Sequence, residues 1–260
     1  MTSDFKKEVN GIRKSRLEPL SIKATDKRRV RHDQRRQRYL TEAMKLVVDE
    51  GIEGLTIARL AGRMRGSNGA IYRYFPSKES LVVSLQELAI ADFHGFMIER
   101  LGALDIRLGN GIAPSPRALA RLMVAFESYL AHAEESPRPH RLVDAFLSSP
   151  EAVLSDAEAA GIAERLIAPI FEVFGGILAE AEAARAIDPG DRSQRTHLAW
   201  AIVHGLDHFR KRDRINPLHL RVASLLPTAR RSYLRGLGAS GEAIAHAEAL
   251  LSTESPVVQA

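Results

Sequence analysis

The sequence contains no cysteine, which excludes a disulfide scaffold, a thiol nucleophile and any cysteine-ligated zinc or iron–sulfur site. This absence agrees with a reducing cytoplasm, where we expect the protein to act. The N-terminus is polar and charged, and no apolar run approaches the roughly 18 residues that a membrane span needs. We therefore predict a soluble protein with neither a signal peptide nor a membrane anchor.

The common signatures of catalysis are also missing. There is no GxSxG elbow, no glycine-rich phosphate loop and no HExxH motif. No alternating strand pattern is present to carry such motifs, so the expected fold class is all-α. We predict no catalytic residue and no cofactor, and an all-α enzyme remains the less favoured alternative.

Charge is distributed unevenly along the 260 residues. Residues 1–80 hold 19 Lys and Arg against 10 Asp and Glu, whereas residues 81–260 hold 18 against 22. Clustered cations suit a polyanion such as DNA, although a basic segment can also serve only solubility. The pattern predicts a basic, DNA-binding front joined to a more neutral body.

The first part of the chain divides into a basic arm and a helix. Residues 1–32 lack helical periodicity and are predicted to be a flexible arm that adds sequence-independent DNA affinity, with Arg28, Arg29 or Arg31 in a neighbouring minor groove. From residue 33 the apolar residues recur at helical spacing, and Gly51 follows where a helix C-terminus favours positive φ. We predict a helix over 33–50.

A compact block with two short helices follows. Thr56 can cap a helix over 57–64, the residues 65–68 form a break, a second helix spans 69–75, and Ser77 caps a third helix from Lys78. Two short helices joined by a tight, glycine-containing turn make a helix-turn-helix.

The second short helix has the composition of a DNA-reading element. Ile71 and Phe75 are spaced to anchor it inward. Glycine and alanine allow close approach to base edges, arginine reaches guanine or phosphate, and tyrosine hydroxyls bond phosphate oxygens. The alternative is that the tyrosines only pack between helices. The side chains left at the outer surface are Asn68, Gly69, Ala70, Tyr72, Arg73 and Tyr74.

The stretch LTIARLAGRMRGSNGAIYRYFPSKESL, residues 55–81, resembles the DNA-binding signature of the TetR/AcrR family of bacterial transcription regulators. The resemblance implies an all-α homodimer whose three N-terminal helices bind double-stranded DNA, an inverted-repeat operator, through the major groove. It covers only about residues 33–83. The family usually has glycine where Arg65 stands and an aliphatic residue where Gly66 stands. The turn can therefore be shifted by one residue. Arg65 itself can be either an additional phosphate contact or a simple surface substitution.

The resemblance also implies roles for individual residues. Those matching phosphate contacts are Thr56, Tyr72, Tyr74 and Lys78, and those matching recognition-helix positions near bases are Ser67, Asn68, Gly69, Ala70 and Arg73.

The rest of the chain is predicted to be a helical body. A helix from Lys78 to about residue 104 would join the DNA-binding domain to this body. Further helices are expected at 116–134, 138–148, 151–186, 192–213, 217–236 and 240–252. Pro169 and the Gly175-Gly176 pair would interrupt the long 151–186 helix. The domains are then the arm 1–32, the DNA-binding domain 33–80 and the effector-binding and dimerisation domain 81–260.

Two apolar helix faces near the C-terminus are expected to form a dimer interface as a four-helix bundle, and resemble the last large helices of TetR-like regulators. Internal core is the alternative. The interface residues are Leu198, Ile202, Gly205, Leu206, Phe209, Val222, Leu226 and Tyr233.

An effector pocket in the body is expected to be apolar, although each group of residues also has the spacing of ordinary core. Its predicted lining is Phe93, Phe96, Met97, Met123, Phe126, Tyr129, Phe146, Ile170, Phe171 and Phe174.

Two pairs of histidines have spacings that could suit a metal ion. His204 and His208 lie four residues apart with Asp207 between them, and His132 and His140 lie in one helix-loop region. Core and surface roles are more common for such residues, so we predict no metal site.

The favoured function is therefore a homodimeric repressor that a small, largely apolar effector of unknown identity releases from its operator. The alternative is an architectural DNA-binding protein without effector control.

Overall fold

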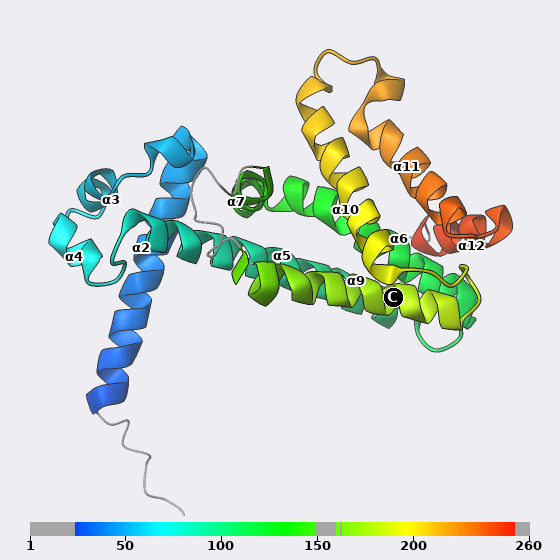
Figure 1. Cartoon of the computed structure of the whole chain (residues 1–260), viewed down its shortest axis with the longest axis horizontal. Helices are drawn as coiled ribbons and strands as arrows, with labels where there is room; N and C mark the ends of the chain where they lie inside the picture. The colour runs from blue at the N-terminus through cyan, green and yellow to red at the C-terminus, as the bar shows by residue number, and fades with distance from the viewer. Residues whose placement is uncertain (1–23, 149–159, 162, 253–260) are drawn as a thin grey trace, which may run out of the picture.

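The computed structural model describes residues 24–148, 160–161 and 163–252. Every regular element in these ranges is helical, as expected (Figure 1). The first four helices are α2 (Ala24–Gly54), α3 (Ile57–Arg63), α4 (Asn68–Tyr72) and α5 (Lys78–Leu108). The body continues with α6 (Pro114–Glu135), α7 (Pro137–Ser148), a π-helical turn η2 (Ala163–Ile167), α9 (Ala168–Ala183), α10 (Arg192–Phe209), two short 3-10 turns η3 (Arg210–Arg212) and η4 (Leu218–Leu220), α11 (Val222–Gly236) and α12 (Gly241–Ser252).

Helix α2 begins nine residues before the predicted helix start at residue 33. Residues 24–32 are helical, so the expectation of a flexible arm is wrong there, and residues 1–23 lie outside the described chain. No glycine or proline interrupts the segment from Ala24 to Glu50, which allows the helix to continue. Its first turns project from the rest of the molecule and need no apolar stripe, which explains why periodicity missed them (Figure 1). Gly51, with φ 74°, ends the regular helix as predicted.

Helices α2, α3, α4 and the first turns of α5 share one small core. Ile71 and Phe75 are both buried in it, as their spacing predicted. The guanidinium of Arg36 lies over the ring of Phe75 at 5.2 Å and donates to the hydroxyl of Ser84 on α5 at 2.7 Å. Arg36 thus fastens α2 to both the end of the helix-turn-helix and the start of α5.

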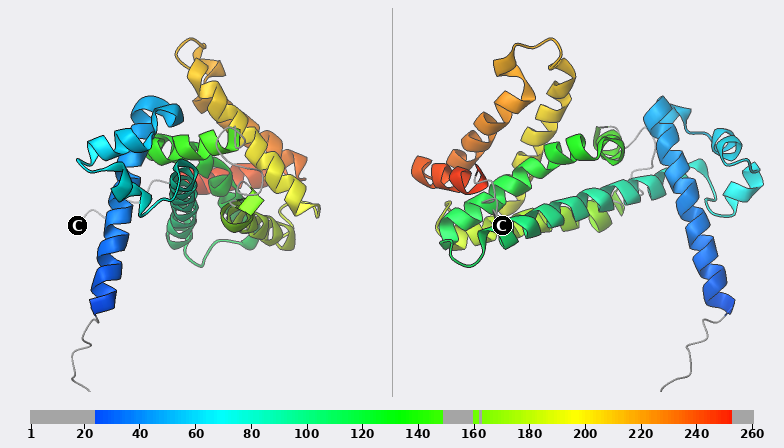
Figure 2. Two further views of the ribbon diagram at one scale, coloured as in Figure 1. Left: turned by 60° about the vertical axis from the view of Figure 1, so that its left-hand side comes forward. Right: turned by 180° about the vertical axis from the view of Figure 1, so that it is seen from behind.

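Helix α5 connects this head to the body. Its 31 residues span about 46 Å, and Figures 1 and 2 show the head at one end and the other helices along the remainder. In the body, α5 packs against α6 and α7, and α6 packs in turn against α9, α10 and α12. Helices α10 and α11 form a hairpin that projects from the body (Figure 2).

The long helix predicted over 151–186 is wrong as one element. Its described part is the π-helical turn η2 followed by α9, while residues 149–159 and 162 lie outside the described chain. Pro169 lies in the first turn of α9, where its missing N–H costs nothing, so it starts a helix rather than kinking one. The Gly175-Gly176 pair stays inside the regular helix.

Among the described residues, helix α5 is the one helix that is long and apolar enough to be compared with a membrane span. By length and composition alone it could cross a membrane, with a mean hydropathy of 1.4 over its most apolar stretch. Half of that stretch is buried inside the protein, where α6 and α7 pack against the helix. Its apolar character therefore matches that of a helix running through the core.

Candidate nucleic-acid interface and ligand cavity

Helix α4 presents its outer face to solvent at the end of the molecule. Ser67 caps it by accepting a hydrogen bond from the Ala70 N–H at 3.3 Å. Asn68, Gly69 and Arg73 are exposed, and Tyr72 is 49% exposed although it is a large aromatic residue. A five-residue helix with this set of exposed groups can enter a groove while Ile71 holds it to the core.

The turn before α4 keeps the expected geometry without the expected glycine. Arg65 adopts φ 50°, in the left-handed region, while its N–H donates to the Gly62 carbonyl at 3.1 Å. The Gly66 N–H reaches back to the Ala61 carbonyl at 2.9 Å, which completes a Schellman motif. The possible one-residue shift of the turn is therefore wrong, because Arg65 itself holds the left-handed position that favours glycine.

Two predicted phosphate contacts lie at the edges of this face. Thr56 is exposed and caps α3 by accepting from the Arg59 N–H at 3.2 Å. Lys78 is half-buried in the first turn of α5, whose cap Ser77 forms a capping box with Ser80. Both residues therefore lie at helix N-termini, where the orphan N–H groups and the helix dipole favour an anion.

Tyr74 is held by packing. Its ring stacks on His32 at 4.6 Å and lies 5.2 Å from the ring of Tyr39, both on α2. The Tyr74 ring thus packs between helices, as the alternative interpretation of the tyrosines proposed. A contact between the Tyr74 hydroxyl and a DNA phosphate stays a prediction.

A second candidate site is an apolar cavity between α5, α6, α9 and α10, with a volume of about 50 Å³. Its polar lining is limited to groups such as the hydroxyls of Tyr129 and Thr196. The walls are formed by Phe93, Met97, Ala125, Phe126, Tyr129, Ile170, Phe171, Phe174, Thr196, Ala199, Trp200 and Val203.

The sequence found three of the four cavity walls. Phe93, Met97, Phe126, Tyr129, Ile170, Phe171 and Phe174 line the cavity as predicted. The missed wall is α10, which contributes Ala199, Trp200 and Val203, because the prediction considered this helix only through its dimer face and left these three residues unassigned. Periodicity identifies apolar faces but not the partner that each face meets.

Three predicted lining residues do not line this cavity. Met123 is fully buried within the core of the body. Phe96 is half-buried beside the ring of His132, with the Arg100 guanidinium over its own ring at 5.5 Å. Phe146 lies on α7, and its side chain is outside the described part of the structure.

The N-terminal part of the chain matches a known family. Residues 40–85 match the model of the bacterial regulatory proteins of the tetR family. These residues therefore form a helix-turn-helix domain of the tetR type, which is a DNA-binding domain of bacterial transcription regulators. No curated protein matches the chain in sequence.

Solved structures share the fold of this protein over most of their length. A transcriptional regulator of the TetR/AcrR family from Thermobifida fusca is 20% identical, with a TM-score of 0.52 over 78% of this chain and 98% of that one. AibR in complex with isovaleryl coenzyme A and operator DNA is 17% identical, with a TM-score of 0.54 over 78% and 97%. RolR in complex with resorcinol is 18% identical, with a TM-score of 0.52 over 87% and 97%.

The predicted dimer face divides between surface and interior in the structure. Leu198 and Phe209 on α10 are 55% and 51% exposed, and Gly205 is exposed beside them. Val222 and Tyr233 are instead buried within the chain, and the Tyr233 hydroxyl donates to the Arg195 carbonyl at 2.9 Å. The internal-core alternative holds for these two residues, which are each only 4% exposed, and the Tyr233 ring stacks on Phe126 of α6 at 5.2 Å. Ile202, Leu206 and Leu226 are half-buried against the core.

Buried histidines connect four helices, α5, α6, α7 and α10, beside the cavity. His132 on α6 contacts Asp92 on α5 through Nε2 at 3.0 Å and His140 on α7 through Nδ1 at 3.4 Å. His140 reaches Asp207 on α10 at 3.1 Å. Burial is the main cause that lowers the pKa of His132, although its bond to Asp92 opposes the effect. Burial favours the neutral form of Asp207, but hydrogen bonds from His140 and Arg210 outweigh it and leave the pKa of that carboxyl lowered.

Proposed function

We propose that the protein is a homodimeric repressor that binds an inverted-repeat operator and is released by a small, largely apolar ligand. The observation that carries the proposal is the continuity of α5. Lys78 at its start lies beside the helix-turn-helix, and Phe93 and Met97 on the same helix line the cavity. A ligand that moves this helix changes the placement of the recognition helix, and differential binding to two such states supplies the coupling.

On the DNA side, α4 would enter the major groove with its neighbours holding the phosphates. Exposure of its outer face supports this placement, as does the pair of capped helix N-termini at Thr56 and Ser77. The residues we assign to DNA are Thr56, Arg65, Ser67, Asn68, Gly69, Ala70, Tyr72, Arg73, Tyr74 and Lys78.

On the ligand side, the cavity favours an apolar or aromatic body with one polar end. A more open hollow adjoins the cavity, since Phe171 and Thr196 line both. Arg192, Ser193 and His197 also line this hollow and can receive a polar group. The similarity to AibR with isovaleryl coenzyme A and to RolR with resorcinol supports a small organic ligand.

The dimer would form through the α10–α11 hairpin. Besides Leu198 and Phe209, the apolar residues Ile215, Leu218 and Leu220 at its far end are 70%, 72% and 44% exposed. Two symmetric heads suit two half-sites along one face of DNA. In this proposal residues 24–80 form the DNA-binding part, residues 81–252 hold the ligand and the dimer contact, and the protein acts in the cytoplasm.

The test begins with selection of genomic fragments by the purified protein, followed by titration of the best fragment and of random DNA at two salt concentrations. A palindromic fragment bound at least about a thousandfold more tightly than random DNA supports the operator proposal. Equal affinity for both would favour the architectural alternative instead.

Ligands can then be found through the only tryptophan in the chain. Trp200 lines the cavity, so an occupying ligand should change its fluorescence. Compounds with that effect are added to the operator complex, and the proposal expects release. A ligand that binds at Trp200 and leaves operator affinity unchanged would contradict the coupling through α5. The variant Trp200→Phe controls for signals that do not arise in the cavity.

A further inference from the structure

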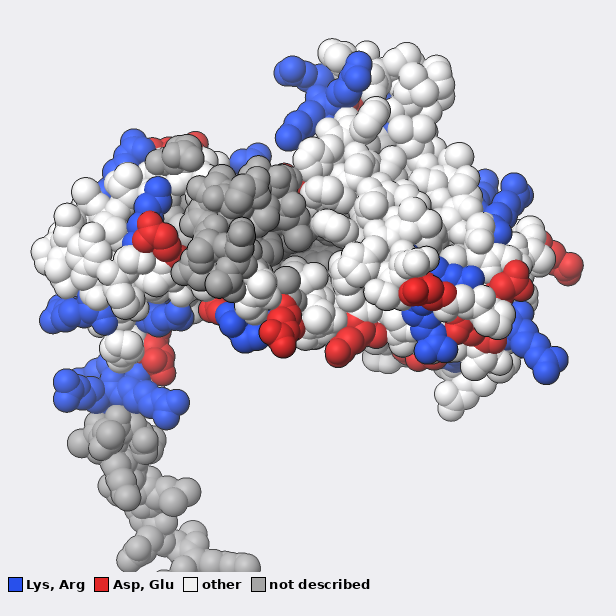
Figure 3. All heavy atoms as spheres, viewed as in Figure 1, with Lys and Arg blue, Asp and Glu red and all other residues white. Residues whose placement is uncertain are grey.

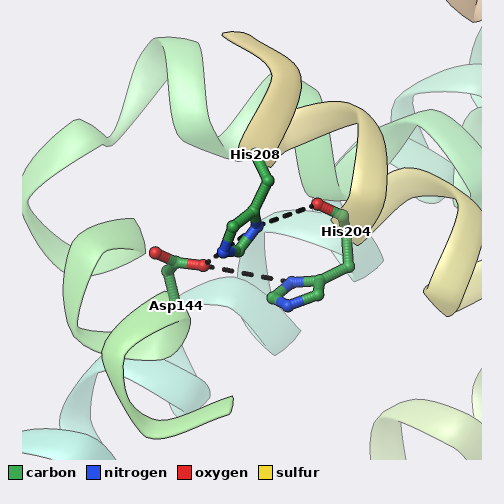
Figure 4. Close-up of side chains that lie close together, drawn as sticks. All are labelled: Asp144, His204 and His208. Atoms are coloured by element: carbon green, nitrogen blue, oxygen red, sulfur yellow. Dashed lines mark hydrogen bonds and ion pairs between the residues drawn. The ribbon is translucent and has the colours of Figure 1, made fainter. Parts of the chain in front are cut away.

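Three metal-binding side chains converge between α7 and α10. His204 and His208 lie one turn apart on α10, and Asp144 faces them from α7 (Figure 4). One ligand atom from each lies within 4.8 Å of the others. The sequence had placed Asp207 with these histidines, but Asp207 instead contacts His140 and Arg210, each at 3.1 Å.

The spacing of these groups leaves room between them. The Asp144 Oδ1 atom is 4.0 Å from Nδ1 of His204 and 3.9 Å from Nδ1 of His208, beyond hydrogen-bond reach in both cases. Ligand atoms around a tetrahedral zinc ion lie about 3.4 Å apart when each bond is about 2.1 Å long. The ligand atoms, which lie within 4.8 Å of one another, must therefore approach by up to about 1.4 Å to close the group onto an ion.

We propose that Asp144, His204 and His208 form a site for a divalent transition metal of the zinc class. Two imidazoles and one carboxylate are ligands that zinc accepts, and a water molecule would complete the tetrahedron. This site is separate from the ligand cavity, and the proposal does not depend on the proposed function.

Neighbouring groups orient both imidazoles. His208 donates from Nδ1 to the His204 carbonyl at 3.2 Å, which leaves its Nε2 lone pair for a metal. The Tyr129 hydroxyl lies 3.1 Å from Nδ1 of His204, and the centroid of the Trp200 ring lies 5.3 Å from that of the His204 imidazole. Such supporting bonds fix ring orientation at known metal sites.

The location gives the site a structural consequence. A bound ion would join α7 to α10. Helix α7 also packs against α2 of the head, where Arg141 donates to the Val48 carbonyl at 3.3 Å, while α10 forms the Trp200 wall of the cavity. Metal binding would therefore fasten the ligand-binding body to a helix that contacts the DNA-binding head.

The experiment is titration of tag-free, metal-stripped full-length protein with Zn²⁺ by calorimetry, and with Co²⁺ by visible absorption. We expect one Zn²⁺ per chain and the intense Co²⁺ bands of tetrahedral coordination. The variants Asp144→Asn and His208→Ala should each weaken Zn²⁺ binding at least about tenfold. Saturating Zn²⁺ should also raise the Tm of the wild-type protein and leave that of His208→Ala unchanged.

The matched control is His246→Ala, which removes an exposed histidine on α12 and should bind Zn²⁺ as the wild-type protein does. His208 is itself exposed, so its removal should leave the fold intact, and circular dichroism checks this. Zn²⁺ binding that is absent from the wild-type protein, or equal in wild type and His208→Ala, would overturn the proposal. Equal binding by Asp144→Asn would overturn it as well.

Discussion

At the residue scale, Arg65 has the least favourable backbone in the DNA-binding head. Its φ of 50° costs an L-residue about 1 kcal/mol or more, a cost that glycine does not carry. Glycine also loses more conformational entropy on folding, which offsets part of this difference. An arginine kept in such a position suggests a role for its side chain, and we infer that role to be a phosphate contact.

Substitution of Arg65 separates backbone strain from side-chain contact. We expect Arg65→Gly to stabilise the protein by about 0.5 kcal/mol, measured by urea unfolding, because the strain is relieved. Arg65→Ala keeps the strained φ and should give no gain. Both variants should bind the operator more weakly by the same factor, and undiminished affinity in both would show that Arg65 contacts no phosphate.

Arg73 and Lys45 make a matched pair within the head. Arg73 is exposed at the end of α4, whereas Lys45 on α2 pairs with Glu42 at 2.7 Å. Arg73→Ala should weaken operator binding about tenfold or more, because alanine cannot reach the base or phosphate that the guanidinium binds. Lys45→Ala should change it less than about twofold in fluorescence anisotropy at fixed salt. Equal effects would place the DNA elsewhere on the head.

At the element scale, the projecting part of α2 replaces the flexible arm that the sequence suggested. Arg28, Arg29 and Arg31 are exposed on it, and Figure 3 shows Lys and Arg side chains gathered where this helix leaves the head. A helix presents these cations at fixed positions, so we expect contacts along the phosphate backbone rather than an extended arm inside the minor groove.

Neutralising this helix should change the salt dependence of DNA binding. In the triple variant Arg28→Ala/Arg29→Ala/Arg31→Ala, the negative slope of log K against log salt should become shallower. Its magnitude should decrease by about one for each phosphate that is no longer neutralised. The affinities for operator and random DNA should decrease by similar factors, because phosphate contacts carry no sequence information. An unchanged slope would leave the projecting helix without a role in DNA binding.

At the scale of the whole molecule, the proposed dimer contact lies on the α10–α11 hairpin. We expect Leu198→Glu/Phe209→Glu to convert the dimer into a monomer in light scattering, because each change buries a carboxylate in an apolar contact. Both residues are exposed in the single chain, so the helical circular dichroism should persist. A variant that still forms dimers would move the interface to another surface.

Stability should also depend on pH through the buried histidine. Because burial lowers the pKa of His132 from its ordinary 6.5, the unfolded chain binds more protons than the folded chain as pH falls through that value. Stability is therefore expected to decrease between about pH 7 and pH 5. Urea midpoints measured across this range should fall, and they should fall less in His132→Gln. A larger decrease in the variant would contradict this assignment.

The sequence by itself determined the local features of this protein. The caps at Thr56 and Ser77, the inward anchors Ile71 and Phe75, and the stop at Gly51 follow from interactions within a few residues. The all-α class and the helix-turn-helix could therefore be predicted. Residue spacing also placed most of the aromatic residues on three walls of the cavity.

The tertiary structure alone decided which residues meet across helices. It brought Trp200 into the cavity, Tyr233 into the interior and Asp144 to His204 and His208. An apolar or polar face is encoded in local periodicity, but its partner depends on the packing of distant segments. The sequence showed that Arg65 stands where related proteins usually have glycine. Only the folded turn showed that the Arg65 backbone is left-handed.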